Sequence, residues 1–140
     1  MVDIYGEYQG DLHCSAQHGP SGAVLVTDAP VDNQGRGASF SPTDLVATGL
    51  GTCMLTVMGI LARKRGIELD GTRVHVKKTM TSVAPRRIAE LAVEVTFPPR
   101  ASYSVAGAQA DFELAANECP VRLSLLDAIA VPTRFIWQSE

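Results

Sequence analysis

Two cysteines are the residues of this sequence best placed to do chemistry. Cys119 stands directly before a proline in the stretch N-E-C-P-V-R, and Cys53 stands in a long apolar stretch far upstream. Proline is favoured at the first position of a helix, so the pattern predicts that Cys119 caps a short helix. Free amides and the positive helix end stabilise a thiolate, which predicts a lowered pKa for Cys119, with Arg122 able to add to the effect.

Cys53 is expected near the middle of a helix, where the backbone amides are already bonded. If it is a nucleophile, other parts of the fold must activate it. The sequence offers three candidates for this support: Arg36 in a glycine-flanked loop, Arg87 in a basic turn, and His18 at a strand end. Each also has an ordinary structural or solvated interpretation.

Packing and metal binding are the alternatives to redox chemistry. Buried cysteines often serve as small apolar side chains, so one or both thiols could be packing only. The third cysteine, Cys14, is expected in the core. The cysteines and histidines show no paired ligand spacing, so no metal is expected.

Composition limits the function further. The 140 residues are 46% hydrophobic and carry a net charge of −3, which suits a single domain over residues 1–140 and argues against nucleic-acid binding. The beginning, M-V-D-I, lacks the basic region of a signal peptide. A small, odd number of cysteines is typical of a protein in a reducing compartment, so a cytoplasmic protein is expected. The uncharged stretch from Leu45 to Ala62 is interpreted as a buried core helix, not a membrane span.

The first part of the chain predicts strands and then a long helix. Residues 4–18 alternate with period two, which predicts one half-buried strand, and residues 23–27 return after a glycine- and proline-rich turn. A loop over residues 28–40 follows. Ser41 and Pro42 then predict a helix start, and Gly66 predicts its end after a basic run.

The rest predicts an α+β fold with antiparallel sheet. Alternation over 72–80 and 88–97 predicts a strand pair, followed by helices over 104–117 and from Pro120 to about Asp127, and a last strand over 133–137. Because the long helix is apolar on nearly every side, it must be covered on every side. A homodimer, in which a partner chain completes the cover, is the expected solution.

These residues resemble a known family. The stretch F-S-P-T-D-L-V-A-T-G-L-G-T-C-M, from Phe40 to Met54, is similar to the helix entry and first cysteine of the OsmC/Ohr family of thiol-dependent organic hydroperoxide reductases. C-P-V-R-L-S-L, from Cys119 to Leu125, resembles its second cysteine motif. T-D-A-P-V-D-N-Q-G-R-G and P-R-R-I further resemble an OsmC-like branch whose members are mostly uncharacterised.

The resemblance implies a fold, a partner and a reaction. It implies antiparallel sheets wrapped around a long buried helix in an intertwined homodimer, with no bound cofactor. Cys53 would be the peroxidatic cysteine, which attacks the O–O bond of an organic hydroperoxide and becomes a sulfenic acid. Cys119 would resolve it as a disulfide, and a dithiol reductant, not identified by the sequence, would reduce that disulfide.

One departure from the family matters. Family peroxidases carry a glutamate just after the helix-entry proline, paired with an arginine that holds the cysteine as thiolate; this chain has Thr43 there, and Arg36 matches the arginine only loosely. The alternative function is therefore an OsmC-like dimer that binds a small apolar or electrophilic ligand without efficient peroxidase activity. A purely structural dimer is the third possibility.

Overall fold

The computed structural model describes residues 1–139, and these form two compact units. One unit comprises residues 1–46, and the other begins at Ala47. The long helix α1 (Pro42–Arg65) spans the boundary between the two units. The expectation of a single domain over residues 1–140 stays a prediction.

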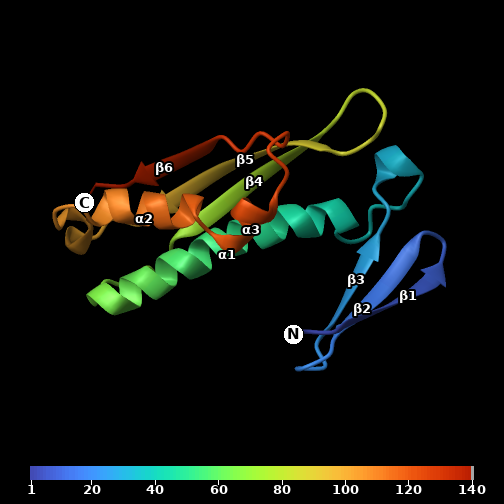
Figure 1. The fold of residues 1–140 in the computed structure, drawn as a ribbon, viewed down its shortest axis with the longest axis horizontal. Helices are drawn as coiled ribbons and strands as arrows, with labels where there is room; N and C mark the ends of the chain where they lie inside the picture. The colour runs from blue at the N-terminus through green and yellow to red at the C-terminus, as the bar shows by residue number, and fades with distance from the viewer. Residues whose placement is uncertain (140) are drawn as a thin grey trace. The chain divides into compact units, whose positions relative to one another are not determined.

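The first unit is a three-stranded antiparallel sheet in the order β1-β2-β3 (Figure 1). Its strands are β1 (Ile4–Gly10), β2 (His13–His18) and β3 (Val24–Asp28), and a short 3₁₀ turn, η1 (Val31–Asn33), follows. The predicted return after the turn at residues 19–22 is confirmed by the pairing of β2 with β3.

The single strand expected over residues 4–18 is wrong, because the chain reverses at Asp11 and Leu12. Both residues have positive φ angles, of 50° and 61°, as tight hairpin turns require. Tyr8 pairs with Cys14 and Ile4 pairs with His18. From Ile4 to Tyr8, each pair of partners shares a face of the sheet and is either even with even or odd with odd. The alternation therefore continues in the same phase after the turn and conceals it.

Helix α1 begins as the sequence predicted. The Ser41 hydroxyl oxygen accepts the N–H of Asp44 at 3.1 Å, and an Asp44 carboxylate oxygen accepts the N–H of Ser41 at 2.8 Å. This reciprocal arrangement is a capping box, which satisfies two amides that a helix start leaves unpaired. The predicted end is also confirmed, because α1 stops at Arg65 and Gly66 takes a φ of 66°.

The second unit packs helices against a mixed sheet. Its strands are β4 (Arg73–Met80), β5 (Ile88–Phe97) and β6 (Thr133–Trp137), and its further helices are η2 (Ala101–Ser104), α2 (Ala108–Asn117) and α3 (Pro120–Ser124). β4 and β5 are antiparallel, as predicted, but β5 and β6 are parallel. In Figure 1, β4 and β5 lie side by side and α2 and α3 belong to the long connection from β5 to β6.

Two predicted helix boundaries are wrong. The helix expected from residue 104 begins at Ala108, because Gly107 has a φ of 79° that no right-handed helix includes. The helix expected to reach Asp127 ends at Ser124, because Leu125 returns to extended backbone with a ψ of 150°. The α+β class itself is confirmed.

The core lies between α1, α2 and the inner face of the sheet. Leu50, Met54 and Met58 of α1 are fully buried together with apolar side chains of β5 and with Phe112 of α2. Phe97 stacks on Trp137 at a centroid distance of 3.6 Å, and the indole N–H donates to a carboxylate oxygen of Glu113 at 3.0 Å.

One face of α1 is buried within this unit and another is open. Ile60 is 53% exposed, and Thr52 and Thr56 are exposed too, with hydroxyls that donate to carbonyls one turn back at 2.8 Å. By length and hydropathy alone α1 could also cross a membrane, although core helices of soluble proteins meet the same criteria. The prediction that a second chain covers the open face stays a prediction.

Gly51 determines how closely α1 approaches β4. A Cβ atom at this position would lie 2.9 Å from Val76 and 3.1 Å from Val74, whereas a Cβ at Gly59 would meet nothing within 4 Å. Both valines are β-branched and stiff, so they cannot move aside cheaply. We therefore expect Gly51→Ala to lower the free energy of unfolding by about 1–3 kcal/mol.

Gly59→Ala is the matched control for this prediction. The same change in the same helix without a clash should leave stability unchanged or raise it by up to about 1 kcal/mol, because alanine favours helix. Urea unfolding of both variants measures the difference. Equal stability of the two variants would show that the contact with β4 does not limit the approach of α1.

Candidate active site

The two cysteines that the sequence singled out lie near one another. Cys53 acts on the Cys119 thiol as a neighbouring side chain and a neighbouring charge, although one residue sits within α1 and the other before α3. No disulfide joins them, and both are free cysteines. The arrangement is therefore a dithiol pair that only the tertiary structure assembles.

Cys119 is held firmly by the chain on both sides. Its N–H donates to the carbonyl of Ala116 at 3.3 Å, and its carbonyl accepts the N–H of Leu123 at 3.1 Å. Pro120 occupies the first position of α3, as predicted, and the Cys119 sulfur accepts the N–H of Arg122 at 3.4 Å. The sulfur thus performs the capping role that a serine or aspartate oxygen usually has.

Burial decides the protonation of Cys119. The side chain is 0% exposed, and this desolvation is the largest influence, raising the pKa of the Cys119 thiol above its ordinary value of 9.0. The Arg122 amide lowers the pKa; the hydrogen bond and the charge of Cys53 raise it, and the Val121 amide lowers it slightly. The predicted lowering is wrong as a net effect, because the helix end is outweighed by burial.

Cys53 differs from Cys119 in its access to solvent. It is partly exposed and packs against the edge of the core, whereas Cys119 belongs to the core itself. Of the two residues, Cys53 is therefore the more accessible to a small molecule from solvent.

The predicted supporting residues have other contacts in this structure. Arg36 pairs with Asp11 at 3.0 Å, with both side chains mostly exposed. A ring nitrogen of His18 lies 2.6 Å from the hydroxyl of Ser21, within the turn between β2 and β3. These contacts belong to the first unit, and they give each side chain a structural partner.

Thr43 and Arg87 have different local settings. The Thr43 hydroxyl lies 3.1 Å from that of Ser41 at the start of α1. Arg87 is exposed in the β4–β5 turn, where its backbone N–H donates to the Thr81 hydroxyl at 3.1 Å. A role for any of these residues in supporting Cys53 stays a prediction.

Cys14, expected in the core, is half-buried in β2 and lies outside the core cluster, which corrects that prediction. Nε of Arg122 is a buried donor that has no hydrogen-bond partner within residues 1–139. The same part of the chain holds no cluster of three His, Cys, Asp or Glu side chains suited to a metal ion.

Comparison with known proteins places this geometry in a family. The family model described as OsmC-like protein matches residues 35–134, which include both cysteines. A protein from Psychrobacter arcticus 273-4, provisionally described as an osmotic stress induced and detoxification response protein, is 42% identical with a TM-score of 0.88; the match covers 96% of each chain. No curated protein matches the sequence.

More distant structures share the fold. An organic hydroperoxide resistance protein OsmC from Legionella pneumophila has 14% identity and a TM-score of 0.75, with 97% of this chain and 96% of that chain covered. A Vibrio cholerae protein described provisionally as an organic hydroperoxide resistance protein, with captopril bound in one of the active sites, has 16% identity and a TM-score of 0.72, with 96% and 90% covered. The match to the family model over residues 35–134 and the 42% identity over nearly the whole chain show that this protein belongs to the OsmC-like family.

Proposed function

We propose that this protein is a thiol-based reductase of organic hydroperoxides, with Cys53 as the peroxidatic and Cys119 as the resolving cysteine. The observation that carries the proposal is the proximity of the two thiols, shown by the influence of Cys53 on the pKa of Cys119. Two cysteines must be neighbours in the fold before a disulfide can join them. Membership of the OsmC-like family, which includes proteins named for hydroperoxide resistance, supports a redox role.

The reaction proceeds in three balanced steps. The Cys53 thiolate attacks the distal peroxide oxygen, the O–O bond breaks, and the alkoxide takes a proton to leave as an alcohol, which converts Cys53 to a sulfenic acid. The Cys119 sulfur then attacks the Cys53 sulfur; its proton and the sulfenic hydroxyl leave as water. Finally a dithiol reductant supplies two electrons and two protons, which restores both thiols and oxidises the reductant to a disulfide.

The different exposure of the sulfurs supports this division of roles. The partly exposed Cys53 can meet a peroxide, while Cys119, at 0% exposure, is shielded from it. A raised pKa keeps the proton on Cys119 until the sulfenic acid has formed, and the proton then leaves with the water. Shielding also protects Cys119 from direct oxidation, which follows thiolate character and access.

The apolar surroundings favour organic over inorganic peroxide. Cys53 packs against a buried cluster that contains Leu50 and Met54. Transfer of an alkyl or aryl group from water to such a surface is favourable by about 25 cal/mol per Å², whereas hydrogen peroxide has no apolar group to bury.

We also propose that the protein works as a homodimer, because the open face of α1 leaves Ile60 53% exposed.

A second candidate function is ligand binding without efficient turnover. It is favoured by the start of α1, where the helix carries the uncharged Thr43 in hydrogen bond with Ser41 and the nearby carboxylate of Asp44 caps the helix. The Vibrio cholerae structure binds captopril in one of its active sites. Saturable binding of a small apolar molecule by a protein that shows no peroxide turnover would favour this function.

Steady-state reduction of cumene hydroperoxide with a small dithiol tests the proposed function. We expect Cys53→Ser to lose turnover entirely, because the attacking sulfur is gone. Cys119→Ser should consume one peroxide per site and then stop as a sulfenic acid, which a trapping reagent and intact mass measure. Cys14→Ser is the matched control and should keep wild-type turnover. Full turnover by Cys53→Ser would refute the assignment.

The stability of the reduced protein should depend on pH through Cys119. Because its folded pKa is raised above 9.0, the unfolded chain releases this proton first as the pH rises. The stabilising contribution is fully present below the unfolded pKa and is lost as the pH rises through the folded pKa.

We therefore expect the stability difference between wild type and Cys119→Ser to shrink as the pH rises above 9.0, the ordinary pKa of a cysteine thiol. Denaturant unfolding under reducing conditions, from about pH 7 to about pH 10, measures it. Cys14→Ser retains Cys119, so the contribution of Cys119 to its stability should depend on pH as in wild type. A difference that stays constant with pH would contradict the burial argument.

A further inference from the structure

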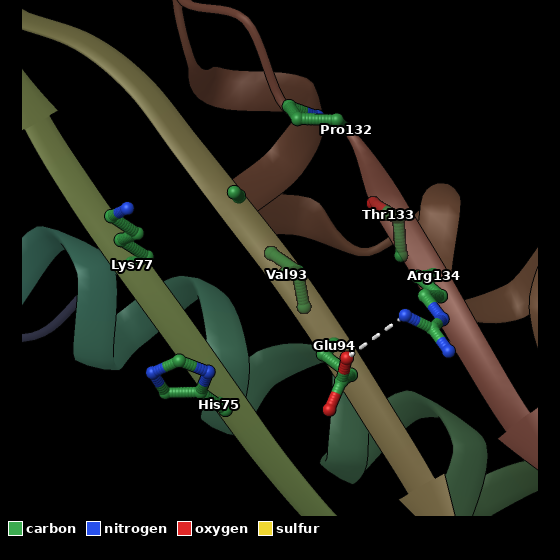
Figure 2. Close-up of a pocket in the computed structure, with 8 residues that line it drawn as sticks. His75, Lys77, Val93, Glu94, Pro132, Thr133 and Arg134 are labelled. Carbon is green, nitrogen blue, oxygen red and sulfur yellow. Dashed lines mark ion pairs between the residues drawn. The ribbon is translucent and has the colours of Figure 1, made fainter.

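The outer face of the β4–β5–β6 sheet carries a shallow cavity of about 320 Å³ (Figure 2). This face lies opposite the core, because β5 directs Leu91, Val93 and Val95 inward at every second position. The cavity is therefore separate from the two thiols. Its lining residues come from all three strands: His75, Lys77, Ala92, Val93, Glu94, Pro132, Thr133 and Arg134.

Strand register builds the cavity from two rows of side chains. Lys77 of β4 pairs with Ala92 of β5 in one row. In the next row His75 pairs with Glu94, which pairs in turn with Arg134 of β6. Figure 2 shows Lys77 and His75 along β4, with Glu94 and Arg134 on the other side. The hollow exists because Ala92 carries only a methyl group between longer neighbours.

The charges around the cavity leave one cation without a partner. Glu94 pairs with Arg134 at 3.8 Å, and that pair is weak because the two side chains are 40% and 74% exposed. Neither Lys77 nor His75 makes a side-chain hydrogen bond or ion pair with any residue that the structure describes. The whole chain has a net charge of −3, so an unpaired ammonium here opposes the overall charge.

We propose that this cavity binds a small organic monocarboxylate. The carboxylate lies at the Lys77 ammonium, where His75 can donate a further hydrogen bond, and the hydrocarbon part covers Ala92 and Pro132. The single unpaired cation matches one negative charge. Repulsion by Glu94 grows with the charge of the ligand, so it disfavours a phosphate dianion more than a monocarboxylate. An inorganic ion also has no apolar surface to bury against Ala92 and Pro132.

A monocarboxylate and an organic hydroperoxide would be recognised by different groups of this protein. Binding here needs a negative head and no oxidisable sulfur, so it does not depend on the proposed redox chemistry. A small exposed site with one charge contact supports weak affinity, on the order of a millimolar dissociation constant. Salt should weaken the binding, because exposed charges are screened over about 10 Å at 0.1 M ionic strength.

Titration of the ¹⁵N-labelled full chain with hexanoate, followed by NMR, tests the proposal. We expect saturable shifts of backbone amides in the two rows, centred on Lys77 and Ala92. Hexanol lacks the charge and inorganic phosphate lacks the apolar part, so both should produce much smaller shifts. No saturable shift with hexanoate would overturn the proposal, and equal binding of phosphate would overturn the carboxylate assignment.

Two variants test the site, one by removing its positive charge and one by filling its hollow. Lys77→Gln removes the cation and Ala92→Leu fills the hollow, so each should weaken hexanoate binding at least about fivefold. Both positions face away from the core, and an otherwise unchanged amide spectrum verifies the fold. Lys64→Gln removes a cation from the exposed end of α1 and should bind hexanoate like wild type. Wild-type affinity of both cavity variants would refute the site.

Discussion

The proximity of Cys53 and Cys119 is the constraint on which the proposed chemistry of this protein depends. Helix α1, which carries Cys53, approaches β4 closely at Gly51, and hydrogen bonds to Ala116 and Leu123 fix the backbone of Cys119. Each of these features is ordinary by itself. The fold as a whole brings together two reactive residues that the sequence holds far apart.

Two opposing physical effects act on Cys119, and their balance determines its chemical state. The amides at the start of α3 stabilise a thiolate, while burial in the core stabilises the neutral thiol. Burial is the larger effect, since an ion loses more by leaving water than two amides return to it. The result is a thiol that keeps its proton beside a more accessible partner, which suits the cysteine that resolves a sulfenic acid better than the one that attacks the peroxide.

Local rules predicted much of this fold. Ser41, Pro42 and Gly66 marked both ends of α1, and Pro120 marked the start of α3, because caps depend on residues that are neighbours in sequence. The hairpin turn at Asp11 and Leu12 escaped prediction, since partner residues of equal parity preserve the alternation. The parallel pairing of β6 with β5 could not be foreseen either, because it depends on how α2 and α3 carry the chain across.

The residues of the candidate site could be predicted from the sequence, but the pKa of Cys119 could not. The types and motifs of Cys53 and Cys119 pointed to a thiol pair, but the degree of burial that raises the pKa of Cys119 is a tertiary property. The outer cavity was missed for a related reason: His75 on an alternating strand is typical of a solvated face. Only the register of three strands brings it together with Lys77, Glu94 and Arg134.

The most direct measurement is peptide mapping by mass spectrometry after one equivalent of an organic hydroperoxide, with free thiols blocked before digestion. We expect a single disulfide between Cys53 and Cys119 to accumulate while Cys14 stays free. Oxidation that leaves Cys53 and Cys119 unlinked, or that links either of them to Cys14, would contradict it.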